Sequence, residues 1–147
     1  MNLATILLST DSNWISVATL FVRIAIGLCF VAHGLGKLGI VGAGNMKQFE
    51  GWLASMKIPF PAIQARMAML SELVGGLLIA SGFVMRAGCI LCIITMLVAS
   101  FIGHKGGRYL ITNTPQGNEY PLNLAVICLL LFVLGPGIYS LDWYLFS

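Results

Sequence analysis

The sequence predicts an all-α integral membrane protein, a four-transmembrane-helix bundle with a short interfacial amphipathic helix between spans 1 and 2. Of the 147 residues, 59% are hydrophobic and only 9% are charged, against roughly 25% charged in a typical soluble domain. The apolar residues gather into segments of membrane-spanning length. We therefore expect one membrane domain over 1–147, with spans at about 14–38, 62–85, 87–103 and 121–134.

The first span carries three basic side chains, Arg23, His33 and Lys37. On a helix, Arg23 and Lys37 fall on one narrow stripe of mostly small residues, and His33 lies at its edge. An ionised side chain at membrane depth costs between ~2.5 and more than 10 kcal/mol, so such residues normally face a bundle interior and pair. We expect this stripe to face the other spans.

A glycine-rich turn follows the first span, and Asn45 is placed to cap a short helix over 46–56. That helix has an apolar face, which includes Trp52, and an opposite polar face. Such a helix is typical of the membrane interface or of the mouth of a bundle. Pro59 and Pro61 then predict an extended turn before the second span.

The second span carries Glu72 among small residues, which would let a neighbouring helix approach closely. A turn containing Arg86 is expected before the third span, which ends at His104. A polar loop leads to Pro121, which is suited to be the first residue of the fourth span. Beyond that span, an aromatic tail predicts an interfacial anchor, with Tyr139, Trp143, Tyr144 and Phe146.

Basic residues predict the topology. They flank the first and third connections, at Lys37, Lys47, Lys57, Arg66, Lys105 and Arg108, whereas only Arg86 marks the second. The positive-inside rule then places those two connections in the cytoplasm and both termini outside. The net charge is only +3 and the basic residues form no stripe, so we expect no nucleic-acid partner.

Antiparallel packing would gather a polar layer at one face of the membrane, formed by His33, Lys37, Glu72, His104, Glu119, Tyr120 and Asn123. Arg23 lies deeper, with Glu72 or Asp142 as its expected partner. One interpretation is structural: buried charges neutralise each other, and a histidine bonds a loop carbonyl. The other is functional, because an apolar pocket with acid, imidazole and hydroxyl groups suits a small lipophilic carbonyl compound.

Four runs carry a family resemblance: RIAIGLCFVAHGLGKLG, FEGWLASMKIPFPA, SELVGGLLIASGFVMRAG and GNEYPLNLAVICLLLFVLGPGIYSLD. Together they resemble the DoxX family of small four-span bacterial membrane proteins over nearly the whole chain. The resemblance implies the bacterial inner membrane. It also implies redox chemistry, since relatives include a subunit associated with thiosulfate:quinone oxidoreductase and members linked to thiol or oxidative-stress defence.

The leading hypothesis is a quinone-associated component of a membrane oxidoreductase. Glu72 and His33 would be catalytic and handle protons, and the cofactor-binding set would be His104, Glu119, Tyr120, Trp52, Arg23 and Lys37. His104, Glu119 and Tyr120 would orient the quinone head group, and Trp52 would close the mouth. No flavin or nicotinamide fingerprint occurs, so electrons would arrive from a redox partner protein or a thiol donor.

Other hypotheses stay open. Cys89 and Cys92 form a CxxC pair for dithiol catalysis, but their apolar surroundings away from the polar layer favour inert packing. His33 and His104 could ligate haem from two spans. The chain could instead be a non-catalytic membrane anchor, a partner subunit or a small-molecule transporter. Besides the lipid bilayer, a homo-oligomer is a possible assembly, and we predict no metal site.

Overall fold

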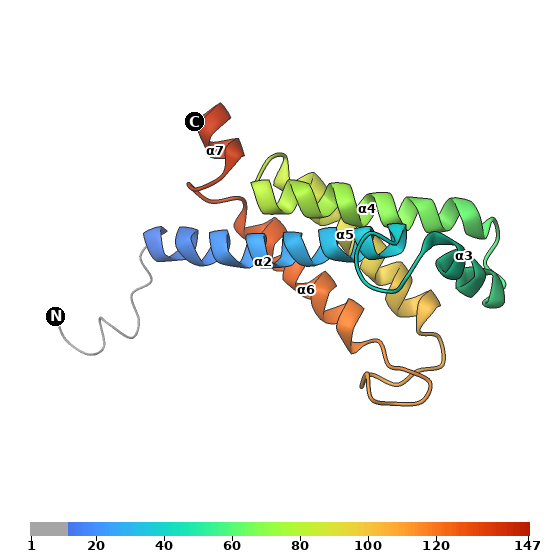
Figure 1. The fold of residues 1–147 in the computed structure, drawn as a ribbon. Helices are drawn as coiled ribbons and strands as arrows, with labels where there is room; N and C mark the ends of the chain where they lie inside the picture. Colours follow the sequence, from blue (N-terminus) through green and yellow to red (C-terminus); the bar gives the residue numbers. More distant parts are fainter. Residues whose placement is uncertain (1–11) are drawn as a thin grey trace.

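The computed structural model describes residues 12–147, and every regular element in that range is helical (Figure 1). The first eleven residues of the predicted domain lie outside this range. The elements are α2 (Ser12–Leu38), α3 (Met46–Ser55), α4 (Pro61–Ser81), α5 (Met85–Val98), the π-helical η1 (Ala99–Gly103), α6 (Glu119–Leu134) and α7 (Leu141–Phe146). The predicted all-α class is confirmed.

Three of these helices are long and apolar enough to cross a membrane: α2, α4, and α5 with its continuation η1. The fourth, α6, is apolar but has only 16 residues, a length of roughly 24 Å at 1.5 Å per residue. The chain is therefore a helical membrane bundle with one short member.

The helices pack in the order α2, α4, α5, α6, and α3 packs on α4. By contrast, α2 touches α6 only slightly, so one side of the bundle is open between them. In Figure 1, α7 and the start of α2 lie at one end, whereas α3 and the loop before α6 lie at the other. The main core cluster joins α2, α4, α5 and α6 through residues such as Phe30, Ile79, Cys92 and Leu131.

Glycines bring α2 and α4 into backbone contact. A Cβ on Gly27 would lie 2.6 Å from the carbonyl oxygen of Gly76, and a Cβ on Gly76 would lie 2.7 Å from that of Gly27. No side chain fits between the two helices at this crossing. The predicted role of small residues near Glu72, close helix approach, is confirmed.

The second span is shorter than predicted. Helix α4 ends at Ser81 rather than near 85, because Gly82 takes a left-handed conformation with φ 68° and its N–H bonds the carbonyls of Leu78 and Ile79. The next helix starts at Met85, so Arg86 lies inside α5 and not in a turn as predicted.

The fourth span also begins earlier than predicted. Helix α6 starts at Glu119, so Pro121 is its third residue rather than its first. The first turn of a helix still accepts proline, because its N–H groups have no intrahelical partner. The predicted cap of α3 is confirmed, since the Asn45 side chain accepts a 3.0 Å hydrogen bond from the N–H of Gln48.

Candidate functional site: a polar layer beside the open side of the bundle

Two charged residues of the predicted layer form an ion pair. The Lys37 ammonium near the end of α2 donates to the carboxylate of Glu72 in α4. The Glu72 side chain is 5% exposed and that of Lys37 is 18% exposed. Pairing removes most of the cost of holding either charge in an apolar bundle. Glu72 is thus the partner of Lys37 and not of Arg23.

The ion pair is connected to the amphipathic helix. The Lys37 ammonium lies 5.0 Å from the ring centroid of Phe49, which stacks on Trp52 at 5.8 Å. The far edge of the Trp52 ring packs against Gly103 in η1, where a Cβ would come within 2.9 Å of it. Trp52 therefore holds α3 against η1.

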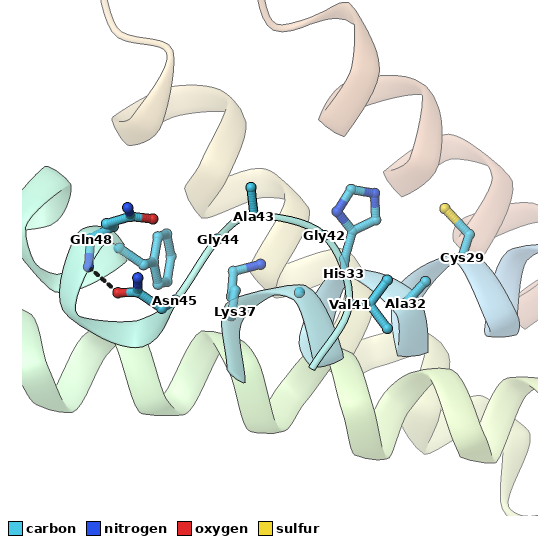
Figure 2. Close-up of a pocket in the computed structure, with 12 residues that line it drawn as sticks. Cys29, Ala32, His33, Lys37, Val41, Gly42, Ala43, Gly44, Asn45 and Gln48 are labelled. Atoms are coloured by element: carbon cyan, nitrogen blue, oxygen red, sulfur yellow. Dashed lines mark hydrogen bonds between the residues drawn. The ribbon is translucent and has the colours of Figure 1, made fainter. Parts of the chain in front are cut away.

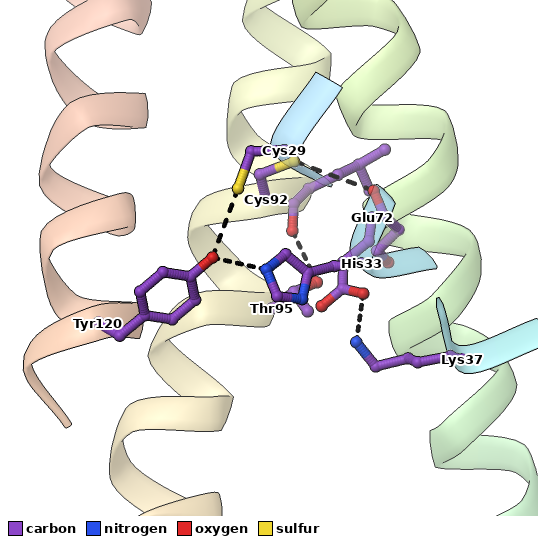
Figure 3. A network of polar contacts seen from close by, with 9 residues as sticks. Cys29, His33, Lys37, Glu72, Cys92, Thr95 and Tyr120 are labelled. Carbon is purple, nitrogen blue, oxygen red and sulfur yellow. Dashed lines mark hydrogen bonds and ion pairs between the residues drawn. The ribbon is translucent and has the colours of Figure 1, made fainter. Parts of the chain in front are cut away.

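A second polar pair bridges the open side of the bundle (Figure 3). Nε2 of His33 in α2 lies 2.5 Å from the hydroxyl of Tyr120, in the first turn of α6. The same hydroxyl lies 3.4 Å from Sγ of Cys29, one helical turn before His33. Tyr120 is 40% exposed, and His33 is also exposed. Both side chains of the pair are therefore exposed where they join α2 to α6.

An open cavity of about 490 Å³ is lined by two of these side chains, Cys29 and His33, but not by Tyr120. Figure 2 shows it between the last turns of α2, the glycine-rich loop and the start of α3. Its lining includes Cys29, His33 and Lys37 from α2 and Asn45 and Gln48 from the capped start of α3. Cavities of 300–1,000 Å³ hold small ligands, so this one has room for a ring-sized head group.

His104 and Glu119 do not line this cavity. Nδ1 of His104 lies 3.2 Å from the carbonyl oxygen of Gln116, within the connection between η1 and α6. The backbone N–H of Glu119 donates to the carbonyl of Tyr109 at the start of α6. The two residues flank the connection between η1 and α6, which folds back on itself, and His104 makes the loop-carbonyl contact of the structural interpretation.

Arg23 lies far from the layer. It precedes His33 by ten residues, roughly 15 Å along the helix, and it is 3% exposed. Its guanidinium donates to the carbonyls of Ser81 and Tyr139. Asp142, the other expected partner, lies close enough to interact electrostatically with Arg23, and its carboxylate accepts from the N–H groups of Val84 (2.7 Å) and Met85 (3.3 Å). These contacts fasten the C-terminal segment to the α4–α5 turn, and they give Arg23 no place at the cavity.

The CxxC pair is buried. Cys89, Cys92 and Cys128 have 0% exposure, and all four cysteines are free. The expectation that the pair lies away from the polar layer is wrong for Cys92, because α5 runs beside α4 and brings its Sγ to 4.0 Å from the carbonyl of Ser71, next to Glu72. A thiol with no exposed surface is inaccessible to a thiol of another molecule, which disfavours thiol–disulfide exchange with a partner.

Cys29 is a cavity residue that the sequence analysis did not single out. The signal was its spacing, because residues four apart on a helix share a face, and Cys29 precedes His33 by four. Within residues 12–147, no group of three or more His, Cys, Asp or Glu side chains is arranged to hold a metal ion.

Comparison with known proteins places the chain in a family. The DoxX family model matches residues 18–105. The inner membrane protein YphA of Escherichia coli strain K12 is 31% identical over 134 residues, a match that covers 86% of this chain and 89% of that protein. No solved structure matches the chain. With its apolar helices, the chain is a multi-pass inner membrane protein, and it belongs to the DoxX family.

Proposed function

We propose that this protein binds the head group of a quinone beside His33 and Tyr120, as a quinone-associated component of a membrane oxidoreductase. One observation carries the proposal: an exposed, hydrogen-bonded imidazole–phenol pair joins α2 to α6, and its imidazole lines a cavity of about 490 Å³. A quinone dissolved in the bilayer would reach this pair laterally, without leaving the hydrocarbon region.

The two side chains have the hydrogen-bonding capacity that a quinone needs. A quinone carbonyl accepts hydrogen bonds, and the hydroxyl of the reduced form also donates them. The phenol of Tyr120 and the imidazole of His33 can each donate or accept. The two side chains can therefore hydrogen-bond both the quinone and the hydroquinone. A group that only donates, such as lysine, could not accept from the hydroquinone.

Lys37 lines the same cavity, and its ion pair with the buried Glu72 completes the proposal. When bound, a quinone supplies a two-electron, two-proton acceptor. The protein must then supply or remove protons in an apolar environment. The carboxylate of Glu72 and the imidazole of His33 are the titratable groups proposed to hold these protons, and Lys37 balances the charge of Glu72.

Electrons come from outside the chain in this proposal. The described thiols of α5 and α6 are buried, and the sequence carries no flavin or nicotinamide fingerprint. A redox partner protein or a thiol or sulfur donor would reduce the bound quinone. This fits the resemblance, which implies thiosulfate:quinone and thiol or oxidative-stress chemistry.

The test is equilibrium binding of a short-chain ubiquinone to the purified protein in nanodiscs. We expect saturable binding to the wild type, weakened about tenfold by Tyr120→Phe, since a net hydrogen bond contributes ~0.5–1.5 kcal/mol. Tyr109→Phe is the matched control, because the Tyr109 hydroxyl bonds Asn123 and not His33. Binding that is absent, or that falls equally in both variants, would contradict the proposal and favour a non-catalytic anchor or a transporter.

A further inference from the structure

The fourth thiol, Cys29, lies in different surroundings from the other three. Cys89, Cys92 and Cys128 are fully buried in the core, whereas Cys29 is only partly buried and lines the cavity. Figure 3 shows its Sγ directed at the Tyr120 hydroxyl, 3.4 Å away, with the His33 ring on the other side of that hydroxyl. A thiol, a phenol and an imidazole thus form one connected chain at the cavity.

We propose that Cys29 is a covalent acceptor for lipophilic quinones that keep an unsubstituted ring carbon. The inference rests on the proposed function, because it assumes that the quinone enters the same cavity. It adds a chemical step that reversible binding does not require. It also makes Cys29 a site of covalent modification, whereas reversible quinone binding gives this cysteine no role.

The connected chain provides a path for the thiol proton. A thiolate is the nucleophile in such additions, so a nearby base must take up the proton. With neutral His33 accepting at Nε2, Tyr120 donates to the imidazole and Cys29 donates to the phenol oxygen. Shifting one proton along each of these two contacts leaves a Cys29 thiolate and a His33 imidazolium. Two helices are needed for this path, since Cys29 and His33 lie on α2 and Tyr120 on α6.

The addition balances without another reactant. Sγ of Cys29 forms a bond to the open ring carbon, and the electron pair of the ring C=C moves to the conjugated carbonyl oxygen. That oxygen takes the proton held by His33. The ring carbon then loses its hydrogen as a proton, which reaches the second carbonyl oxygen and restores an aromatic ring. The product is a thioether of the hydroquinone, so forming the C–S bond reduces the quinone by two electrons.

The experiment treats the full-length protein in nanodiscs, under anaerobic conditions, with 1,4-naphthoquinone, which has open ring carbons. Intact-mass and peptide mass spectrometry then locate and time the adduct. We expect one adduct, on Cys29, that is lost in Cys29→Ser and kept in Cys128→Ser. An adduct on Cys89, Cys92 or Cys128 at a comparable rate, or no adduct at all, would overturn the proposal.

The role of the base is tested by rates. General-base assistance contributes ~100-fold or more in many enzymes, and we expect His33→Gln to slow adduct formation at least about tenfold. Tyr109→Phe is the matched control and should leave the rate unchanged, because the Tyr109 hydroxyl bonds Asn123 and not His33. Circular dichroism checks that each variant is folded. An unchanged rate in folded His33→Gln would refute the proton path.

A second ligand separates this proposal from the proposed function. The ring carbons of ubiquinone are all substituted, so ubiquinone reports reversible binding alone. Reversible ubiquinone binding without any naphthoquinone adduct would refute the thiol proposal and leave the quinone site standing. An adduct on Cys29 without reversible binding would support the reactive thiol and refute the proposed quinone site.

Discussion

The contact between α2 and α4 allows a sharp prediction about stability. Replacing Gly76 by alanine places a Cβ 2.7 Å from the Gly27 carbonyl oxygen and 2.9 Å from both the Val31 amide nitrogen and the Phe30 Cβ. Ordinary van der Waals contact begins near 3.4 Å. Two of the three obstacles are backbone atoms, so α2 must move away from α4. Because overpacking a close-packed interface costs ~1–3 kcal/mol, we expect Gly76→Ala to lower the free energy of unfolding by that amount.

The matched control is Gly51→Ala. Gly51 is also a helix-interior glycine, in α3, but a Cβ there would meet no atom within 4 Å. Alanine is favoured over glycine inside a helix by ~0.5–1 kcal/mol, so this variant should be as stable as the wild type or slightly more stable. Unfolding of both variants in mixed detergent and SDS, followed by circular dichroism, measures the difference. Equal stability of Gly76→Ala and Gly51→Ala would refute the backbone contact between α2 and α4.

Three further outcomes are expected. Lys37→Met leaves the Glu72 carboxylate buried without its counter-ion and should lower the free energy of unfolding by ~3–5 kcal/mol. Adding Glu72→Leu to this variant should restore most of that stability. Additive effects of the two substitutions in a double-mutant cycle would exclude the ion pair. Asp142→Ala removes the cap on the first N–H groups of α5 and should cost ~1 kcal/mol in the same unfolding assay, a loss that Asp142→Asn should reduce. Both termini are predicted outside, so a C-terminal alkaline phosphatase fusion should be active and a green fluorescent protein fusion dark; the reverse pattern would invert the topology.

Much of the fold follows from the amino-acid sequence. Apolar runs of membrane length, glycine and proline breaks, and Asn45 as a helix cap predict the helices and the amphipathic segment between the first two. The errors lie at helix ends. The apolar run of α4 continues past Gly82, where the helix ends, and the next helix starts at Met85, where Asp142 from the distant C-terminal segment caps it. A contact between residues so far apart in the sequence leaves no local signal.

The site is only partly predictable for a similar reason. Depth along each span places Lys37, Glu72, His33 and Tyr120 in one layer. The structure then pairs Lys37 with Glu72 and His33 with Tyr120, two pairs that the sequence did not single out. The depth of a residue along its span does not show how the helix is rotated about its axis or where the side chain points. It therefore misses the part that Cys29 plays, and it overestimates His104, whose ring is taken by a loop carbonyl.

The central claim is that a quinone head group binds beside His33 and Tyr120. Native mass spectrometry of the wild type and of Tyr120→Phe, each extracted in mild detergent from the host membrane, tests it most directly. We predict a stoichiometric quinone on the wild type and a strongly reduced fraction of quinone-bound Tyr120→Phe. A wild type that carries no quinone, or a Tyr120→Phe variant that retains it equally, would contradict the claim.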